Sequence, residues 1–177
     1  MCIRDSYSAY KHVGLTAVRY PRGAGTGAKE QPQMTEIPMG KASVIQDGKN
    51  VAILSFGTLL PAAIAAANAI GATVVNMRFV KPLDTELLKK LAAKHDLLVT
   101  LEENVVAGGA GSGVNEYLAS AGIATPTLNL GLPDRYIDHG SQNALLAECG
   151  LDADGIEASI VASPFYQPVL KDVKKRV

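Results

Sequence analysis

The pattern of apolar and polar positions changes near residue 37. Beyond it, short apolar runs alternate with segments in which apolar residues recur every three to four positions, as in buried strands and amphipathic helices. The runs predict strands over residues 41–46, 51–56, 73–77, 97–101 and 125–130. The periodic segments predict helices over residues 60–70, from the cap Asp84 to about His95, over 111–121, and after the caps Ser141 and Asp152.

The alternation of strands and helices predicts an α/β fold with right-handed βαβ units and a mostly parallel sheet of about five strands. Asp47 and Gly48 form a turn signal between the first two strands, which predicts one antiparallel edge strand. Binding sites in such sheets lie at the carboxyl ends of the strands. Here these ends carry Gly57-Thr58, Arg78, Glu102-Glu103-Asn104 and Gly131 to Asp134.

Residues 1–36 follow a different pattern. Tyr7 to His12 fits the end of a helix and Thr16 to Tyr20 (TAVRY) a short strand, and a Gly- and Pro-rich stretch follows, which is typical of turns and a linker. One strand and a linker cannot enclose a hydrophobic core. We therefore expect this segment to belong to a domain whose remainder lies outside the chain.

Composition excludes several function classes. The 177 residues hold 17 Lys plus Arg and 17 Asp plus Glu, so the charge balance gives no electrostatic case for nucleic acid or an anionic membrane. The basic cluster at residues 171–176 is interpreted as a solvated tail. No apolar run reaches the ~20 residues of a membrane span. Cys2 and Cys149 are too few for a zinc site or a disulfide framework, which fits a cytoplasmic protein, and Cys149 is expected in the core.

The glycine-rich stretch from Gly108 to Gly113 follows a strand and opens a helix, as a phosphate cradle would. Its glycine spacing fits neither a dinucleotide fingerprint nor a P-loop, so close backbone packing is the favoured interpretation. Glu102 and Glu103 are adjacent on a strand, so their side chains should point to opposite faces. They cannot act as a paired acid and base, although one of them is positioned to accept N–H groups from the glycine stretch.

The remaining candidates are histidines and arginines. His12, His95 and His139 lack metal-ligand spacing and are interpreted as structural, with His95 at a helix end where the dipole favours a partly charged imidazole. Arg19 and Arg22 flank Tyr20-Pro21. Arginine suits two-point binding of a phosphate or carboxylate, but an arginine pair is also common in surface salt bridges.

Five strings resemble the 1-deoxy-D-xylulose-5-phosphate synthase family in the expected order. They are VRYPRG at 18–23, LSFGTL at 54–59, NMRFVKPLD at 76–84, LEEN at 101–104 with GGAGSGVNE at 108–116, and LNLGLPD at 128–134. The resemblance implies a three-layer, transketolase C-terminal-like domain. It also implies an enzyme that joins pyruvate and glyceraldehyde 3-phosphate into 1-deoxy-D-xylulose 5-phosphate and CO2, a precursor of isoprenoids, thiamine and pyridoxal phosphate.

In that family, thiamine diphosphate and Mg2+ are bound by domains with no matching segment here, so no catalytic, cofactor or metal residue is expected in this chain. The second arginine of VRYPRG corresponds to the residue that grips the acceptor phosphate, which makes Arg22 the predicted substrate-binding residue. The C-terminal domain is expected to support a homodimer, and the glycine stretch and Glu102-Glu103 to support packing.

The resemblance also divides the chain. Residues 1–6 (MCIRDS) match nothing in the family and are interpreted as a non-native leader. Residues 7–36 correspond to the end of a pyrimidine-binding domain plus a linker, 37–163 to the C-terminal domain, and 164–177 to a tail. The chain is then expected to be a fragment, inactive alone. Two alternatives are a stand-alone dimerisation or regulatory module, and one chain of a split thiamine-diphosphate enzyme.

Overall fold

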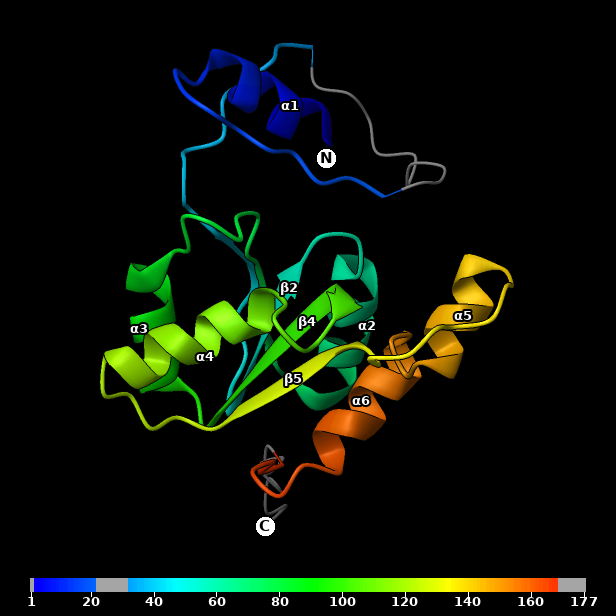
Figure 1. The fold of residues 1–177 in the computed structure, drawn as a ribbon. Coiled ribbons are helices and arrows are strands. Elements are labelled where there is room, and N and C mark those ends of the chain that lie inside the picture. Colours follow the sequence, from blue (N-terminus) through cyan, green and yellow to red (C-terminus); the bar gives the residue numbers. More distant parts are fainter. Residues whose placement is uncertain (1, 22–31, 169–177) are drawn as a thin grey trace.

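A five-stranded mixed sheet forms the middle layer of the molecule (Figure 1). The computed structural model describes residues 2–21 and 32–168. The strands lie in the order β1-β3-β2-β4-β5, with β1 antiparallel to β3 and the other pairs parallel. Their bounds are β1 (Ser43–Gln46), β2 (Val51–Phe56), β3 (Thr73–Asn76), β4 (Leu97–Val105) and β5 (Thr127–Leu132).

Helices cover both faces of this sheet, which confirms the predicted α/β fold with three layers (Figure 1). One face carries α2 (Leu60–Ile70), α5 (Gln142–Glu148) and α6 (Ala153–Val161), and the other carries α3 (Thr85–Lys94) and α4 (Ala110–Ser120). The remaining helix, α1 (Cys2–Lys11), lies apart from these layers with the segment that follows it.

The central strand β2 explains why the sheet needs two helical layers. All six of its residues are buried, which is the pattern of a parallel strand covered on both faces. Because side chains alternate along a strand, Val51 and Ile53 join the core beneath α2 and α6, whereas Ala52 and Leu54 join the core beneath α3 and α4. The sheet therefore separates two hydrophobic cores.

Side-chain caps fix the starts of three helices, as the sequence predicts. Asp84, Ser141 and Asp152 accept main-chain N–H groups in the first turns of α3, α5 and α6. Asp84 is buried and also accepts from the N–H of Ala42 at 3.0 Å, so it joins the start of β1 to α3. The helix α2 ends at Gly71, whose positive φ of 71° suits glycine.

The edge strand β1 is antiparallel, as predicted, but its partner is β3 and not its sequence neighbour β2. Both edges of β2 are taken by parallel pairing with β3 and β4, so the turn at residues 47–48 does not close a hairpin. It instead packs on residues 71–72 after α2, and the N–H of Gly48 donates to Oγ1 of Thr73, the first residue of β3, at 2.8 Å. The strands β4 and β5 also extend further than predicted, to Val105 and Leu132.

The prediction of a strand over Thr16–Tyr20 is wrong for the described residues, among which this segment pairs with no strand. The preceding helix α1 is attached to the residues that lead into the domain: the guanidinium of Arg4 donates to the carbonyl of Thr35 at 3.2 Å, and the N–H of Ile37 donates to Ser8 Oγ at 2.8 Å. The domain boundaries inferred from the sequence stay predictions.

Candidate functional site at the carboxyl edge of the sheet

The carboxyl end of β4 meets the start of α4 at Glu102. This side chain is 3% exposed, and each carboxylate oxygen accepts one main-chain N–H: Oε2 from Ala110 at 2.7 Å and Oε1 from Gly111 at 2.9 Å. These N–H groups belong to the first turn of α4 and have no partner within the helix. Glu102 therefore occupies the position of a bound anion at a helix N-terminus, where the dipole favours negative charge.

The glycines of the 108–113 stretch make this close approach possible. A Cβ atom on Gly109 would overlap the Glu102 carboxylate, and one on Gly111 would lie 2.5 Å from Thr100 Oγ1. The structure thus supports close backbone packing as the role of the stretch. The alternative considered from the sequence was a cradle for an external phosphate. It conflicts with the structure, because the Glu102 carboxylate already occupies the N–H groups that would bind the phosphate.

A polar network continues beneath α4 and connects three elements. The amide of Asn129 on β5 donates to Thr100 Oγ1 on β4 at 2.6 Å, and the amide of Asn115 on α4 donates to Asn129 Oδ1 at 2.8 Å. With Glu102, these contacts fix the position of α4 on the sheet. The sequence analysis did not find this network, because its members share no local spacing.

Glu103 makes its contacts on the opposite side of β4, as the alternation predicts. Its carboxylate accepts from the hydroxyl of Thr58, which follows β2, and from Nε2 of Gln142 at 2.9 Å, at the start of α5. Its main-chain carbonyl accepts from the Arg19 guanidinium at 3.0 Å. Through this hydrogen bond, the N-terminal segment contacts the carboxyl edge of the sheet at Glu103.

His95 is buried at the other edge of the sheet, 4% exposed. Nδ1 lies 2.9 Å from the Leu91 carbonyl, which can only accept, so Nδ1 carries the proton. Nε2 then accepts from the Thr73 hydroxyl at 2.7 Å. Burial lowers the pKa of His95 below its ordinary value, against the opposing effect of the Leu91 carbonyl. The lowered pKa argues against the partly charged imidazole expected from the sequence, and the two buried hydrogen bonds support a structural role for His95.

Stability is therefore expected to fall in acid through His95. A histidine with a lowered folded-state pKa is neutral in both the folded and the unfolded state above about pH 6.5. Its full contribution to the free energy of unfolding is present there. As pH falls below 6.5, the unfolded state takes up a proton first, and the free energy of unfolding drops by at most about 1.4 kcal/mol per pH unit. Denaturant titrations between pH 5 and 8 should show this slope in the wild type and a shallower one in His95→Gln. Parallel curves would contradict the expectation.

The other sequence candidates are not brought together. The side chains of His12 and His139 are exposed and form no hydrogen bond with the described residues, and Cys149 is half-buried at the edge of a core and not inside it. Arg22, the predicted substrate-binding residue, lies outside the described residues. Within residues 2–21 and 32–168, no three His, Cys, Asp or Glu side chains cluster as metal ligands, and no helix has the length and hydrophobicity to cross a membrane.

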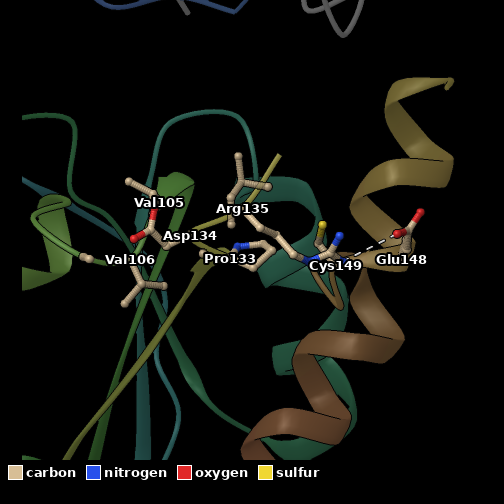
Figure 2. A pocket seen from close by; sticks show the side chains of 10 residues that line it. Val105, Val106, Pro133, Asp134, Arg135, Glu148 and Cys149 are labelled. Atoms are coloured by element: carbon tan, nitrogen blue, oxygen red, sulfur yellow. Dashed lines mark ion pairs between the residues drawn. The ribbon is translucent and has the colours of Figure 1, made fainter. Parts of the chain in front are cut away.

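A groove of about 520 Å³ opens at the carboxyl ends of β4 and β5 (Figure 2). Val105, Val106 and Pro133 form apolar parts of its lining. Figure 2 shows Arg135 directed toward Glu148, with 3.7 Å between Nη2 and Oε1. Both side chains are more than half exposed, so this ion pair adds little stability, but it balances the arginine charge. The groove therefore offers little uncompensated charge to an anionic ligand.

The fold and the sequence together define the class of protein. Residues 40–156 match the model of the family described as transketolase, C-terminal domain, and the chain belongs to that family. It is 58% identical over 159 residues to the 1-deoxy-D-xylulose-5-phosphate synthase of Chromobacterium violaceum and 57% identical over 159 residues to that of Cellvibrio japonicus. Each alignment covers 90% of this chain and 26% or 25% of the relative, so the chain spans about a quarter of the length of these curated relatives.

A solved structure gives an independent likeness. It is described as "Split gene transketolase, inactive beta4 tetramer", with a TM-score of 0.64 and 35% sequence identity. The match covers 71% of this chain and 42% of that chain. The mostly parallel sheet with one antiparallel strand pair is thus the fold of a transketolase C-terminal domain.

Proposed function

We propose that this chain is the C-terminal part of a 1-deoxy-D-xylulose-5-phosphate synthase. The whole enzyme would convert pyruvate and glyceraldehyde 3-phosphate into 1-deoxy-D-xylulose 5-phosphate and CO2, for isoprenoid, thiamine and pyridoxal phosphate synthesis. The observation that carries this proposal is the 58% identity to a synthase over 90% of the chain. The proposal also includes a cytoplasmic location, which rests only on the resemblance to this synthase family.

The residues described here do not fit the cofactor of such an enzyme. Thiamine diphosphate would need a diphosphate site and a metal, but the helix N-terminus that resembles an anion site is filled by Glu102, and the described residues contain no metal-ligand cluster. In this proposal, thiamine diphosphate and Mg2+ are bound by other parts of the synthase, as the family resemblance implies. This chain would supply a scaffold domain, part of a homodimer interface, and Arg22.

A fusion experiment tests the proposal. The front three quarters of the Chromobacterium violaceum synthase would be joined to this chain at the start of their alignment, and formation of 1-deoxy-D-xylulose 5-phosphate would be assayed. We expect an active fusion and no turnover by the chain alone. Activity of the chain alone, or a soluble but inactive fusion, would contradict the proposal. Activity after mixing two separate chains would favour a split enzyme, as the name of the solved relative suggests for that protein.

In the active fusion, replacing Arg22 by alanine is expected to weaken use of the phosphorylated acceptor. Loss of a charged, two-point contact costs on the order of 2–5 kcal/mol, so kcat/KM for glyceraldehyde 3-phosphate should fall at least about 30-fold. The KM for pyruvate and the turnover of unphosphorylated glyceraldehyde are the internal controls. Unchanged acceptor kinetics would remove Arg22 from the substrate site.

A further inference from the structure

We propose that the free edge of β5 is a docking surface for a second copy of this chain. The two β5 strands would pair antiparallel about a two-fold axis and join the sheets of both copies into one. The inference deepens the homodimer interface included in the proposed function, and it rests on that proposal for its role in the whole synthase. The pairing itself depends only on the main chain and side chains of β5 and its surroundings.

The outer edge of β5 presents unpaired main-chain groups. β5 is the last strand of the sheet, and Figure 1 shows no strand beyond it among the described residues. The carbonyls of Pro126 and Leu132 both accept N–H groups on the β4 side. Because successive strand residues direct their main-chain groups to opposite sides, Thr127, Asn129 and Gly131 direct theirs away from β4. These outward groups have no hydrogen-bond partner among the described residues.

The opposite edge of the sheet is protected against pairing, whereas β5 is not. β1 has four residues and an irregular register between Val44 and Gln46, and short or bulged edge strands resist pairing with another chain. β5 has six residues, TLNLGL, with no charged side chain among them. An uncharged edge strand of this length is a template for a further strand.

The outward groups of β5 are self-complementary. In an antiparallel pair, residues at every second position exchange two hydrogen bonds with the residue opposite. With the two-fold axis at Asn129, this residue would pair with its own counterpart, and Thr127 would pair with Gly131 of the second copy. Every outward N–H and C=O group of both strands then has a partner. A register that maps onto itself in this way is what a two-fold interface between identical chains requires.

The side chains of β5 fit the same register. Leu128 and Leu130 pack against the core beneath α2 and α6, and Leu128 would lie opposite Leu130 of the second copy. This arrangement continues an apolar stripe across the axis, and the uncharged strand brings no like charges together. On the α4 face, Gly131 has no side chain, which leaves room for Thr127 of the second copy.

Two grooves lie next to the ends of β5. Gly131 to Pro133 line the groove of about 520 Å³, and Pro126 and Thr127 line a second groove of about 280 Å³ beside α4. In an antiparallel pair, the amino end of one β5 lies beside the carboxyl end of the other, so unlike grooves of the two copies would meet. The surface available for contact therefore extends beyond the strand, which matters because a specific interface buries about 800 Å² per partner.

Sedimentation velocity of the 177-residue chain tests the association. We expect a species of about 37 kDa, twice the 18.5 kDa of one chain, at high micromolar concentration, and its dissociation on dilution. Thr127→Pro removes an outward N–H group at an edge position where proline is tolerated, and it should raise the Kd at least about tenfold. Thr127→Val keeps this N–H group and a β-branched side chain, so it is the matched control and should associate like the wild type.

Residue-resolved hydrogen exchange of the wild-type chain identifies the surface. The amides of Thr127, Asn129 and Gly131 should exchange at least about tenfold more slowly at high than at low protein concentration, because they become bonded in the dimer. The amides of Leu128 and Leu130 point toward β4 in both states, so their exchange should change less. This measurement needs no variant and decides the question even where Thr127→Pro fails to fold, which circular dichroism would reveal.

Three results would overturn the inference. The first is a chain that stays monomeric at all concentrations, and the second is a dimer in which the three outward amides exchange as fast as in the monomer. The third is a folded Thr127→Pro protein that associates like the wild type. Protection of the outward amides in a monomeric fusion enzyme would likewise exclude a second copy and assign the edge to another part of the synthase. An inactive fusion would contradict the proposed function, and sedimentation and exchange would still decide the strand pairing.

Discussion

Replacing Glu102 by alanine is expected to lower the free energy of unfolding by about 3–5 kcal/mol. The substitution leaves the N–H groups of Ala110 and Gly111 buried without their acceptor, and each such orphan costs about 1–3 kcal/mol. It also removes a negative charge from the positive end of the α4 dipole, a loss that adds to the effect. Chemical denaturation followed by circular dichroism would measure the change.

Two variants sharpen this experiment. Glu102→Gln keeps one oxygen acceptor but turns an amide N–H2 group toward the second main-chain donor, so it should lose a smaller but clear part of the stability. Glu116→Ala removes an exposed acid from the same helix and should stay within about 0.5 kcal/mol of wild type. A Glu102→Ala protein as stable as the wild type would show that α4 does not depend on the Glu102 carboxylate.

The second large effect is expected at Gly111. Alanine normally stabilises a helix by about 1 kcal/mol relative to glycine. At Gly111, however, the added Cβ would lie 2.5 Å from Thr100 Oγ1 and 2.6 Å from Asn129 Nδ2. These two atoms already form a hydrogen bond with each other. Overpacking of this kind costs about 1–3 kcal/mol, and disruption of the network adds to it, so we expect a net loss of about 2 kcal/mol.

Gly113 is the matched control for this prediction. It lies in the same helix, two positions further on, and a Cβ there would meet nothing within 4 Å. Gly113→Ala should therefore raise the free energy of unfolding by about 0.5–1 kcal/mol. The two glycine variants should move the denaturation midpoint in opposite directions, and a shift in the same direction would contradict the close packing described for Gly111.

Local sequence pattern predicted most of the fold because its signals are themselves local. The run VAILSF is apolar throughout, so it identifies β2 as a strand buried on both faces. Asp84, Ser141 and Asp152 act as caps within three residues of their own positions. The partner of β1 was not predictable from local pattern, because the choice between β2 and β3 depends on which of these strands keeps a free edge after parallel pairing.

In the candidate site, too, the contacts set by local sequence were predictable and the long-range contacts were not. Alternation along β4 was enough to place Glu102 and Glu103 on opposite sides, and the glycine stretch indicated a source of N–H groups for one of them. Nothing in the local sequence shows that Gln142 reaches Glu103 from 39 positions away. For His95, the helix end favoured a charged ring, whereas the surrounding fold buries the side chain, and this desolvation lowers its pKa despite the hydrogen bond to the Leu91 carbonyl.

The carboxylate in the first turn of α4 has a further consequence. Because Glu102 belongs to the same chain as the N–H groups that it binds, its effective concentration at the helix is set by the fold and not by the surrounding solution. Domains that need an external phosphate to complete such a turn become more or less ordered as metabolite levels change. Here the chain itself supplies the anion, so the order of this turn should not depend on the concentration of an external phosphate.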